Sequence, residues 1–187
     1  MFPTIGARNF AKSERERHDF YATDPLALDA LLDLISFETN VWECACGQGH
    51  LSEVLKARGY NVFSSDLIDR GYGDARIDFL GCKTKWNGAI ITNPPYKQAL
   101  QFVKKALEVV CDGNHVVMFL RLLFLETKAR GEFFKVHPPK WIYVSRSRVA
   151  CAKGGNFEEH GKNKAICYAW FIWEKGFTGE PTIRWFN

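Results

Sequence analysis

Continuous apolar runs alternate along this chain with segments whose apolar residues recur at helical spacing. Runs of the first kind predict buried strands, and segments of the second kind predict amphipathic helices. Strands are expected over residues 41–46, 60–64, 76–80, 88–91, 115–124, 141–144 and 165–173, with a possible last strand at 182–186. Helices are expected over 50–58, 98–111 and 126–137. The alternation predicts an α/β fold, a doubly wound, mostly parallel seven-stranded sheet covered on both faces.

A further helix is predicted before the first strand. Asp24 is a favourable N-cap residue, and Pro25 suits the first helical position because its fixed φ matches the helix and its missing N–H is not needed there. The apolar residues expected on the buried face of this helix are Leu26, Leu28, Leu31, Leu32 and Ile35.

Length and composition indicate one globular domain. The chain has 187 residues, of which 47% are hydrophobic and 25% charged. No apolar run approaches the roughly 20 residues of a membrane span, and residues 1–16 lack the pattern of a signal peptide. We expect a flexible N-terminal arm over residues 1–19, a single domain over 20–187, and a cytoplasmic location. The net charge of +4 permits a polyanionic partner.

The six cysteines suggest neither a metal site nor a disulfide framework. Cys44 and Cys46 form a C-x-C pair, but no second pair follows at zinc spacing. Cys111 and Cys167 lie in or beside apolar patterns, where cysteine acts as a small hydrophobe. We therefore expect free thiols in a reducing compartment and no bound metal.

Chemically distinctive residues stand where the predicted strands end. Gly47 and Gly49 follow the first strand of the sheet, Asp66 follows the second, Asp78 lies in the third, and Asn93 follows the fourth. Parallel sheets bind ligands beyond the carboxyl ends of their strands, near the point where the strand order reverses. These five residues are therefore expected to converge on one site.

The first three strand ends suggest a nucleoside pocket. Glycines let the backbone approach a ligand, and an acidic residue such as Asp66 can accept from both ribose hydroxyls. Asp78 could accept from an adenine amino group while Phe79 packs on the ring. Ser52 occupies the position of the third glycine in a dinucleotide fingerprint, which disfavours a nicotinamide-dependent oxidoreductase. In the alternative interpretation, the glycines only form a turn and Asp78 caps a loop.

The segment Asn93-Pro94-Pro95-Tyr96 suggests a rigid binding site for a flat group that carries an NH2. Two prolines end the strand and stiffen the carbonyls around Asn93. The Asn93 side-chain oxygen and the Pro94 carbonyl could accept both hydrogens of an exocyclic amine, and Tyr96 could stack on its ring. Such a site acts through orientation and electrostatics. The alternative is a turn in which Asn93 caps the following helix.

Taken together, these segments resemble the S-adenosylmethionine-dependent amino-methyltransferases, above all the adenine-N6 DNA methyltransferases. Residues 93–96 match their [DNS]-P-P-[YFW] motif, residues 43–49 look like their glycine motif, and residues 20–25 look like the segment bordering the methionine moiety. The resemblance implies a Rossmann-like class I methyltransferase fold with S-adenosyl-L-methionine as cofactor. It implies cofactor contacts from Tyr21, Thr23, Glu43, Ala45, Gly47, Gly49, Asp66, Leu67, Asp78, Phe79 and Asn93, and catalytic roles for Asn93, Pro94, Pro95 and Tyr96.

The motif order is like the γ-type arrangement, and the small size is similar to that of the compact phage and prophage enzymes. These implied relatives act on DNA, with the target adenine flipped out of the duplex. The resemblance makes Phe157 the candidate to stack on that base beside Tyr96. Candidate phosphate contacts are Arg15, Arg17, Lys97, Arg121, Arg146 and Arg148.

Other substrates stay open at this point. The same motif serves methylation of RNA and of protein glutamine amides, so either could replace DNA. From another class, the chain could be a non-catalytic S-adenosylmethionine-binding module. The expected partners are DNA, with RNA possible, and no membrane, and the expected state is a monomer or weak dimer.

Overall fold

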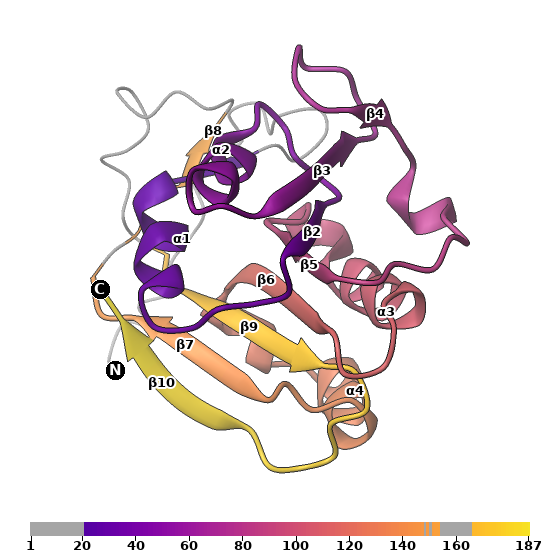
Figure 1. Cartoon of the computed structure of the whole chain (residues 1–187). Helices are drawn as coiled ribbons and strands as arrows, with labels where there is room; N and C mark the ends of the chain where they lie inside the picture. Colours follow the sequence, from indigo (N-terminus) through magenta and orange to yellow (C-terminus); the bar gives the residue numbers. More distant parts are fainter. Residues whose placement is uncertain (1–20, 148, 150, 154–165) are drawn as a thin grey trace, which may run out of the picture.

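The computed structural model describes residues 21–147, 149, 151–153 and 166–187 (Figure 1). The predicted arm over residues 1–19 lies outside the described residues, and so do Phe157, Arg15, Arg17 and Arg148.

The described residues form an eight-stranded sheet with the order β10-β7-β9-β6-β5-β2-β3-β4. Its strands are β2 (Asn40–Glu43), β3 (Asn61–Asp66), β4 (Ala75–Arg76), β5 (Ala89–Thr92), β6 (His115–Arg121), β7 (Trp141–Ser145), β9 (Tyr168–Glu174) and β10 (Thr182–Phe186). β9 runs antiparallel to both of its neighbours, and the other pairs are parallel. The predicted α/β, doubly wound, mostly parallel sheet is confirmed. The eighth strand is β10, which the sequence suggested as a possible last strand.

Helices cover both faces of the sheet, as Figure 1 shows. The α-helices are α1 (Pro25–Leu32), α2 (His50–Ala57), α3 (Ala99–Val109) and α4 (Lys128–Val136), and the 3-10 helices are η1 (Phe79–Gly81), η2 (Tyr96–Gln98) and η3 (Leu122–Leu125). Successive residues of β5 feed opposite cores, because strand side chains alternate between faces. Ala89 and Ile91 pack with α1 and α2, whereas Ile90 packs with α3. All four residues of β5 are buried, which explains its continuous apolar pattern.

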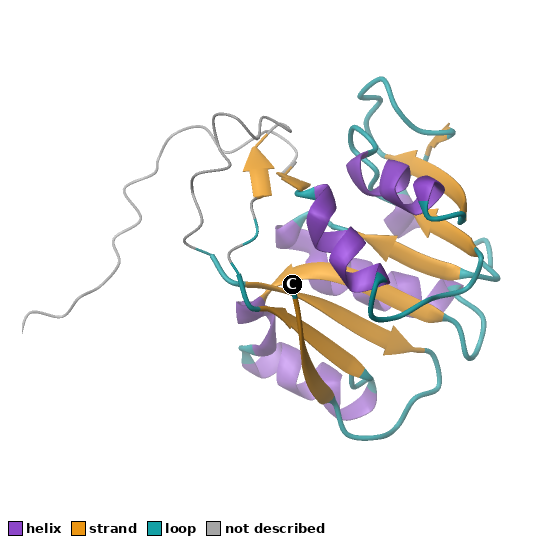
Figure 2. Ribbon diagram, turned by 60° about the vertical axis from the view of Figure 1, so that its left-hand side comes forward, coloured by secondary structure: helices purple, strands orange, loops and turns teal. Residues whose placement is uncertain are grey.

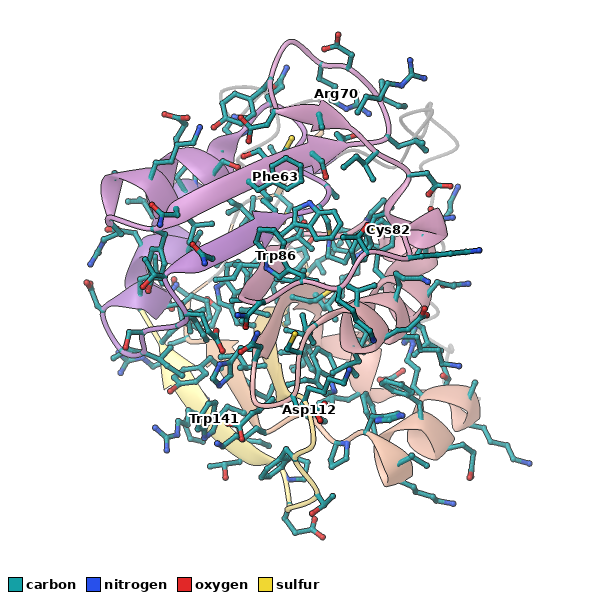
Figure 3. All side chains as sticks on the ribbon, turned by 45° about the vertical axis from the view of Figure 1, so that its right-hand side comes forward. Phe63, Arg70, Cys82, Trp86, Asp112 and Trp141 are labelled. Atoms are coloured by element: carbon teal, nitrogen blue, oxygen red, sulfur yellow. The ribbon has the colours of Figure 1, made fainter. Side chains whose placement is uncertain are left out.

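Buried tryptophans join the layers through their ring N–H groups. Trp170 of β9 donates a 2.9 Å hydrogen bond to the Ala27 carbonyl and so fastens α1 to the sheet. Trp42 of β2 donates a 2.8 Å bond to Ser65 Oγ on β3. Phe63 and Trp86 stack with centroids 6.1 Å apart, and both rings also pack against Trp42 (Figure 3). Each buried indole thus has a partner for its polar atom, as burial requires.

Several predicted boundaries are wrong. The strand expected over 76–80 consists only of Ala75–Arg76, because the Asp78 side chain accepts from the Leu80 N–H and starts η1 instead. Leu26, expected on the buried face of α1, is 71% exposed. Ala27, Leu28 and Leu31 face the sheet, and Leu26 lies outside the arc that they define.

A small second sheet was not predicted. β1 (Tyr21–Thr23) pairs antiparallel with β8 (Cys151–Lys153), and the pair stands beyond the main sheet (Figure 2). Each strand has three residues, and their partners are far apart in the sequence, so neither shows a local periodicity. The pairing brings the segment before α1 to the end of the sheet where the predicted site lies.

None of the six cysteines forms a disulfide bond. Cys44 is buried, but Cys111 is only half-buried and Cys167 is exposed, so the expectation that both behave as small core hydrophobes does not hold. Within the described ranges, no group of three or more potential ligands is arranged to hold a metal ion. Of the helices in the part of the chain that the structure describes, none has the length and hydropathy of a membrane span.

Candidate functional site

A cavity of about 690 Å³ opens at the carboxyl ends of the central strands. From β2 the chain proceeds outward to β3 and β4, and then returns to place β5 on the other side of β2. The strand order therefore reverses between β2 and β5, which is where ligands bind in sheets of this type. The cavity is lined by residues that follow β2, β3, β4 and β5, together with residues of β1.

Most of the predicted site residues lie on this cavity. The lining includes Thr23, Glu43, Ala45, Asp66, Leu67, Asp78, Phe79, Asn93, Pro94, Pro95 and Tyr96. Gly47, Gly49 and Tyr21 are not among the lining residues, although each is next in sequence to one that is. His50, Arg70, Gln98 and Phe102 also line the cavity but were not predicted as site residues. Nothing in their local pattern distinguishes them from ordinary loop or helix residues.

The turn after β2 depends on its glycines and on Asp66. Gly47 has φ of 58° and Gly49 has φ of 85°, in the left-handed region that favours glycine. The Gly47 N–H donates to Asp66 Oδ2 at 2.9 Å, and the Ile68 N–H donates to Oδ1 at 2.9 Å. A Cβ at Gly49 would lie 2.4 Å from the Tyr72 ring. The glycine turn is therefore held against β3, and a Cβ at Gly49 would fit only if the Tyr72 ring moved.

Glu43 is fully buried at the end of β2, under the glycine turn. Its carboxyl accepts a hydrogen bond from Ser52 Oγ on α2, and Ser52 Oγ lies 2.6 Å from Ser64 Oγ on β3. Burial raises the pKa of Glu43 to about 8, although the hydrogen bond from Ser52 opposes the rise. The cavity thus has a carboxyl group in its wall that is largely protonated at neutral pH.

The segment after β5 leaves the sheet as a rigid turn. Pro94 is buried, Asn93 and Pro95 are half-buried, and the Pro95 carbonyl accepts from the Gln98 N–H at 2.9 Å to start η2. Pro95 is the N-cap of η2 and Gln98 is the N-cap of α3. The interpretation in which Asn93 caps the following helix is therefore wrong, and its amide group stands on the cavity wall instead.

Tyr96 lies where several elements meet. The Arg121 guanidinium at the end of β6 lies 4.7 Å from the Tyr96 ring centroid, and the Tyr168 ring of β9 is 6.0 Å away. The Tyr96 hydroxyl lies 3.5 Å from Cys151 Sγ on β8. Burial, and after it the neighbouring Cys151 and Tyr168, raise the pKa of Tyr96 well above its usual value. The phenol is neutral, so it offers a ring face rather than a base.

The cavity wall carries both acidic and basic side chains, the basic ones being Arg70 and Lys97. The carboxyl side chains of Asp66 and Asp78, with the buried Glu43, line it around the ends of β2, β3 and β4. Phe79 is buried beside Asp78 and provides an aromatic surface next to these polar groups. Asn93, Pro94, Pro95 and Tyr96 line the same cavity. The carboxylates and the turn after β5 therefore share one cavity.

The predicted phosphate contacts that can be placed have different surroundings. Lys97 is exposed and lines the cavity. Arg121 is half-buried beside Tyr96. Arg146 is exposed, and its Nε donates to the Asn187 carbonyl at 2.7 Å, which ties it to the C-terminal residue. Only Lys97 and Arg121 lie next to the candidate site.

No protein-family model matches the chain, and no curated protein sequence matches it. Solved structures do match. A protein from Listeria monocytogenes assigned to the class I S-adenosylmethionine-dependent methyltransferases has a TM-score of 0.61 and 14% identity, with 93% of this chain and 67% of that chain covered. A protein from Pyrococcus horikoshii assigned as an RNA methyltransferase has a TM-score of 0.54 and 14% identity, with 82% of both chains covered.

A methyltransferase subunit of a type I restriction-modification system from Streptococcus thermophilus has a TM-score of 0.59 and 15% identity, with 86% of this chain and 46% of that chain covered. Identities this low show the fold alone. The fold is that of the class I S-adenosylmethionine-dependent methyltransferases, a Rossmann-like single domain, as the sequence predicted.

Proposed function

We propose that this protein transfers a methyl group from S-adenosylmethionine to the exocyclic N6 amine of adenine in DNA. The observation that carries the proposal is that Asn93, Pro94, Pro95 and Tyr96 line the same cavity as Asp66 and Asp78. The turn that would bind the amine and the residues that would bind the nucleoside therefore line one cavity of about 690 Å³.

The residues present fit this cofactor. S-Adenosylmethionine supplies an electrophilic methyl group on a positively charged sulfur. Asp66 would accept from the ribose hydroxyls, because its carboxylate stands on the wall and is fixed by the Gly47 N–H. Asp78 would accept from the adenine amino group, with Phe79 and Leu67 against the ring. The Asp66 and Asp78 carboxylates also attract the positively charged groups of this cofactor.

The acceptor residues would orient the amine and its lone pair. An aromatic amine is a weak nucleophile because its lone pair is delocalised into the ring. Hydrogen bonds from the amine to the Asn93 side-chain oxygen and the Pro94 carbonyl favour a pyramidal nitrogen whose lone pair points into the cavity. Tyr96 would hold the ring by stacking, and the two prolines keep the acceptors rigid. Orientation and preorganised electrostatics supply the rate enhancement.

The choice of DNA as the acceptor rests on observations of its own. The resemblance of residues 93–96 to the adenine-N6 DNA enzymes favours it, and one structural neighbour is a restriction-modification methyltransferase subunit. Another neighbour is assigned as an RNA methyltransferase, so RNA belongs in every assay.

The test is transfer of labelled methyl from S-adenosylmethionine to duplex DNA, single-stranded DNA, RNA and a glutamine-containing peptide mixture. Digestion of the product to nucleosides and mass spectrometry identify the modified atom. We expect N6-methyladenine from DNA, and loss of transfer in Asn93→Ala with binding of S-adenosylhomocysteine retained. Asn87→Ala is the matched control, because Asn87 is exposed just before the other end of β5.

The outcomes separate the alternatives. Label in RNA or protein, but never in DNA, would overturn the substrate and keep the chemistry. Cofactor binding without transfer to any acceptor would support the non-catalytic module. Failure to bind S-adenosylhomocysteine by calorimetry would overturn the proposal as a whole.

A further inference from the structure

A second hollow lies beside the acceptor turn and shares Tyr96 with the main cavity. It has a volume of about 230 Å³ and is lined on its polar side by Arg121 and Arg130. Its apolar side includes Leu123 and Phe124. Arg121 ends β6, Leu123 and Phe124 belong to η3, and Arg130 is on α4. The hollow therefore lies at the carboxyl end of the strand next to β5.

Both arginines are held by the surrounding structure. The Arg121 guanidinium lies 4.7 Å from the Tyr96 ring centroid, and the Arg130 guanidinium lies 4.7 Å from the Phe124 ring centroid. Arg130 Nη1 donates a 3.0 Å hydrogen bond to the Leu123 carbonyl, and this bond holds the guanidinium against η3. Stacking and backbone hydrogen bonds fix the position of a guanidinium without neutralising its charge.

Arg121 keeps a donor for a ligand. Its Nε is buried and has no hydrogen-bond partner among the residues that the structure describes. A buried N–H without an acceptor carries a free-energy penalty, which an incoming oxygen acceptor would remove.

The charged side chains of this hollow are all basic. Its lining contains two arginines and no Asp or Glu, whereas the main cavity is lined by both acidic residues (Glu43, Asp66 and Asp78) and basic ones (Arg70 and Lys97). The hollow therefore suits an anion. A guanidinium offers parallel N–H groups that match the oxygens of a phosphate.

An exposed leucine borders these cations. Leu123 lines the hollow and is 59% exposed, although it is on the short η3 helix beside buried Phe124. Proteins that kink DNA insert apolar side chains such as leucine between base steps. An exposed leucine beside two arginines therefore favours a polynucleotide strand over a small free anion.

We propose that this hollow binds a phosphodiester of the strand that carries the acceptor base, next to the nucleotide whose base enters the Asn93–Tyr96 turn. This inference rests on the proposed function for its choice of strand. Arg121 and Arg130 contact the phosphate, and Leu123 fills the space that the extruded base leaves. Arg121 also lies over Tyr96, so it links phosphate binding to the position of the ring that holds the base.

The test measures affinity and its salt dependence with fluorescein-labelled, adenine-containing oligonucleotides as duplex DNA, single-stranded DNA and RNA. We expect Arg121→Ala and Arg130→Ala each to weaken binding by about tenfold at low salt. The slope of log Kd against log salt is expected to fall by roughly one for each arginine removed. Binding of S-adenosylhomocysteine should be unchanged in both variants.

Arg184→Ala is the matched control. Arg184 on β10 also lies over aromatic rings, 5.9 Å from both the Trp141 and Tyr143 centroids, but β7 and β9 separate it from β6. The affinity and the salt slope of Arg184→Ala should equal those of the wild type.

Arg130→Lys replaces Arg130→Ala if the alanine variant fails to fold. It keeps the positive charge and loses the paired N–H donors of the guanidinium, so it should bind the oligonucleotide more weakly and keep the wild-type salt slope.

A neutral methylphosphonate placed in turn on each side of the adenine locates the phosphate. One position should weaken binding to the wild type and have no further effect on the Arg121→Ala/Arg130→Ala double variant. Unchanged affinity and slope in folded Arg121→Ala and Arg130→Ala would overturn the inference, even if the wild type methylates DNA. If the arginine-dependent binding is found but no acceptor is methylated, the proposed function fails and this site stands.

Discussion

The backbone N–H of Gly47 donates a 2.9 Å hydrogen bond to Asp66 Oδ2, and this bond ties the turn after β2 to the end of β3. The other oxygen of the same carboxylate accepts from the Ile68 N–H at 2.9 Å. One side chain therefore fixes the backbone on both sides of the candidate nucleoside pocket and also stands on its wall.

Asp66→Ala is expected to weaken binding of S-adenosylhomocysteine by at least about tenfold. The substitution removes the proposed acceptor of the ribose hydroxyls and releases the glycine turn, each worth about 1 kcal/mol or more for a charged acceptor. Isothermal titration calorimetry measures the change directly.

Asp69→Ala is the control for that experiment. Asp69 is exposed, and its Oδ1 also accepts from a loop glycine, the Gly71 N–H at 2.8 Å, but it does not line the cavity. Its affinity should equal that of the wild type. Equal losses in the two variants would contradict a direct role for Asp66 and point to general loosening of the loop.

Gly49→Ala is expected to lower the free energy of unfolding by at least about 2 kcal/mol. Part of the loss comes from the left-handed backbone, with φ of 85°, which costs about 1 kcal/mol for a residue with a Cβ. The rest comes from the contact of the new Cβ with the Tyr72 ring, only 2.4 Å away. Urea denaturation gives the difference.

Gly59 provides the comparison that separates these two causes. It has φ of 86° and nothing within 4 Å of a built Cβ, so Gly59→Ala should show the backbone cost alone. In a double-mutant cycle, Tyr72→Ala should remove most of the excess cost of Gly49→Ala. Equal costs at Gly49 and Gly59 would show that the Tyr72 ring moves aside freely.

The buried Glu43 predicts a pH dependence of stability. Burial raises its pKa from 4.5 to about 8 in the folded protein, so the folded state binds a proton that the unfolded state has released between these values. The stabilisation is full below about pH 4.5 and is lost as the pH rises towards about 8. Glu43→Gln should flatten this decline by up to about 1.4 kcal/mol per pH unit. Denaturation at a series of pH values from 5 to 9 measures it.

Glu53→Gln is the matched control for the pH series. Glu53 is on α2, is exposed, and accepts from the Tyr72 hydroxyl at 2.6 Å, which lowers its pKa. A lowered pKa contributes stability that is lost only in more acidic solution, so this variant should keep the wild-type decline between pH 5 and 8. An unchanged decline in Glu43→Gln would contradict the protonated state of Glu43.

The convergence of Asp66, Asp78 and Asn93 could be predicted from the sequence because strand order and strand ends depend on local patterns. Each residue follows a continuous apolar run or lies in one, and the ends of parallel strands meet at one edge. The same reasoning wrongly placed Asp78 inside a strand. Its side chain instead caps the 3-10 helix η1, which replaces the expected strand.

Features made by long-range contacts left no local pattern. The pairing of β1 with β8 joins segments about 130 residues apart and uses only three residues from each. Arg121 stood among the scattered basic residues, and only the packing of β6 beside β5 shows that it lies over Tyr96. The two arginines of the second hollow likewise become one site only in three dimensions.

The ring of Tyr96, rather than its hydroxyl, is expected to serve methyl transfer. Tyr96→Phe removes only the hydroxyl, which lies 3.5 Å from the Cys151 thiol and also forms a hydrogen bond with Tyr168, and it keeps the ring beside Arg121 and Tyr168. Transfer by Tyr96→Phe should stay within about threefold of the wild type, because the ring that would stack on the acceptor base is kept. Tyr96→Ala removes the stacking surface and should lose about 10- to 100-fold. Single-turnover transfer with excess enzyme measures both, after thermal denaturation has shown that the variants fold. If Tyr96→Phe loses as much as Tyr96→Ala, the hydroxyl and its contact with β8 are the functional part, and stacking on the ring is wrong.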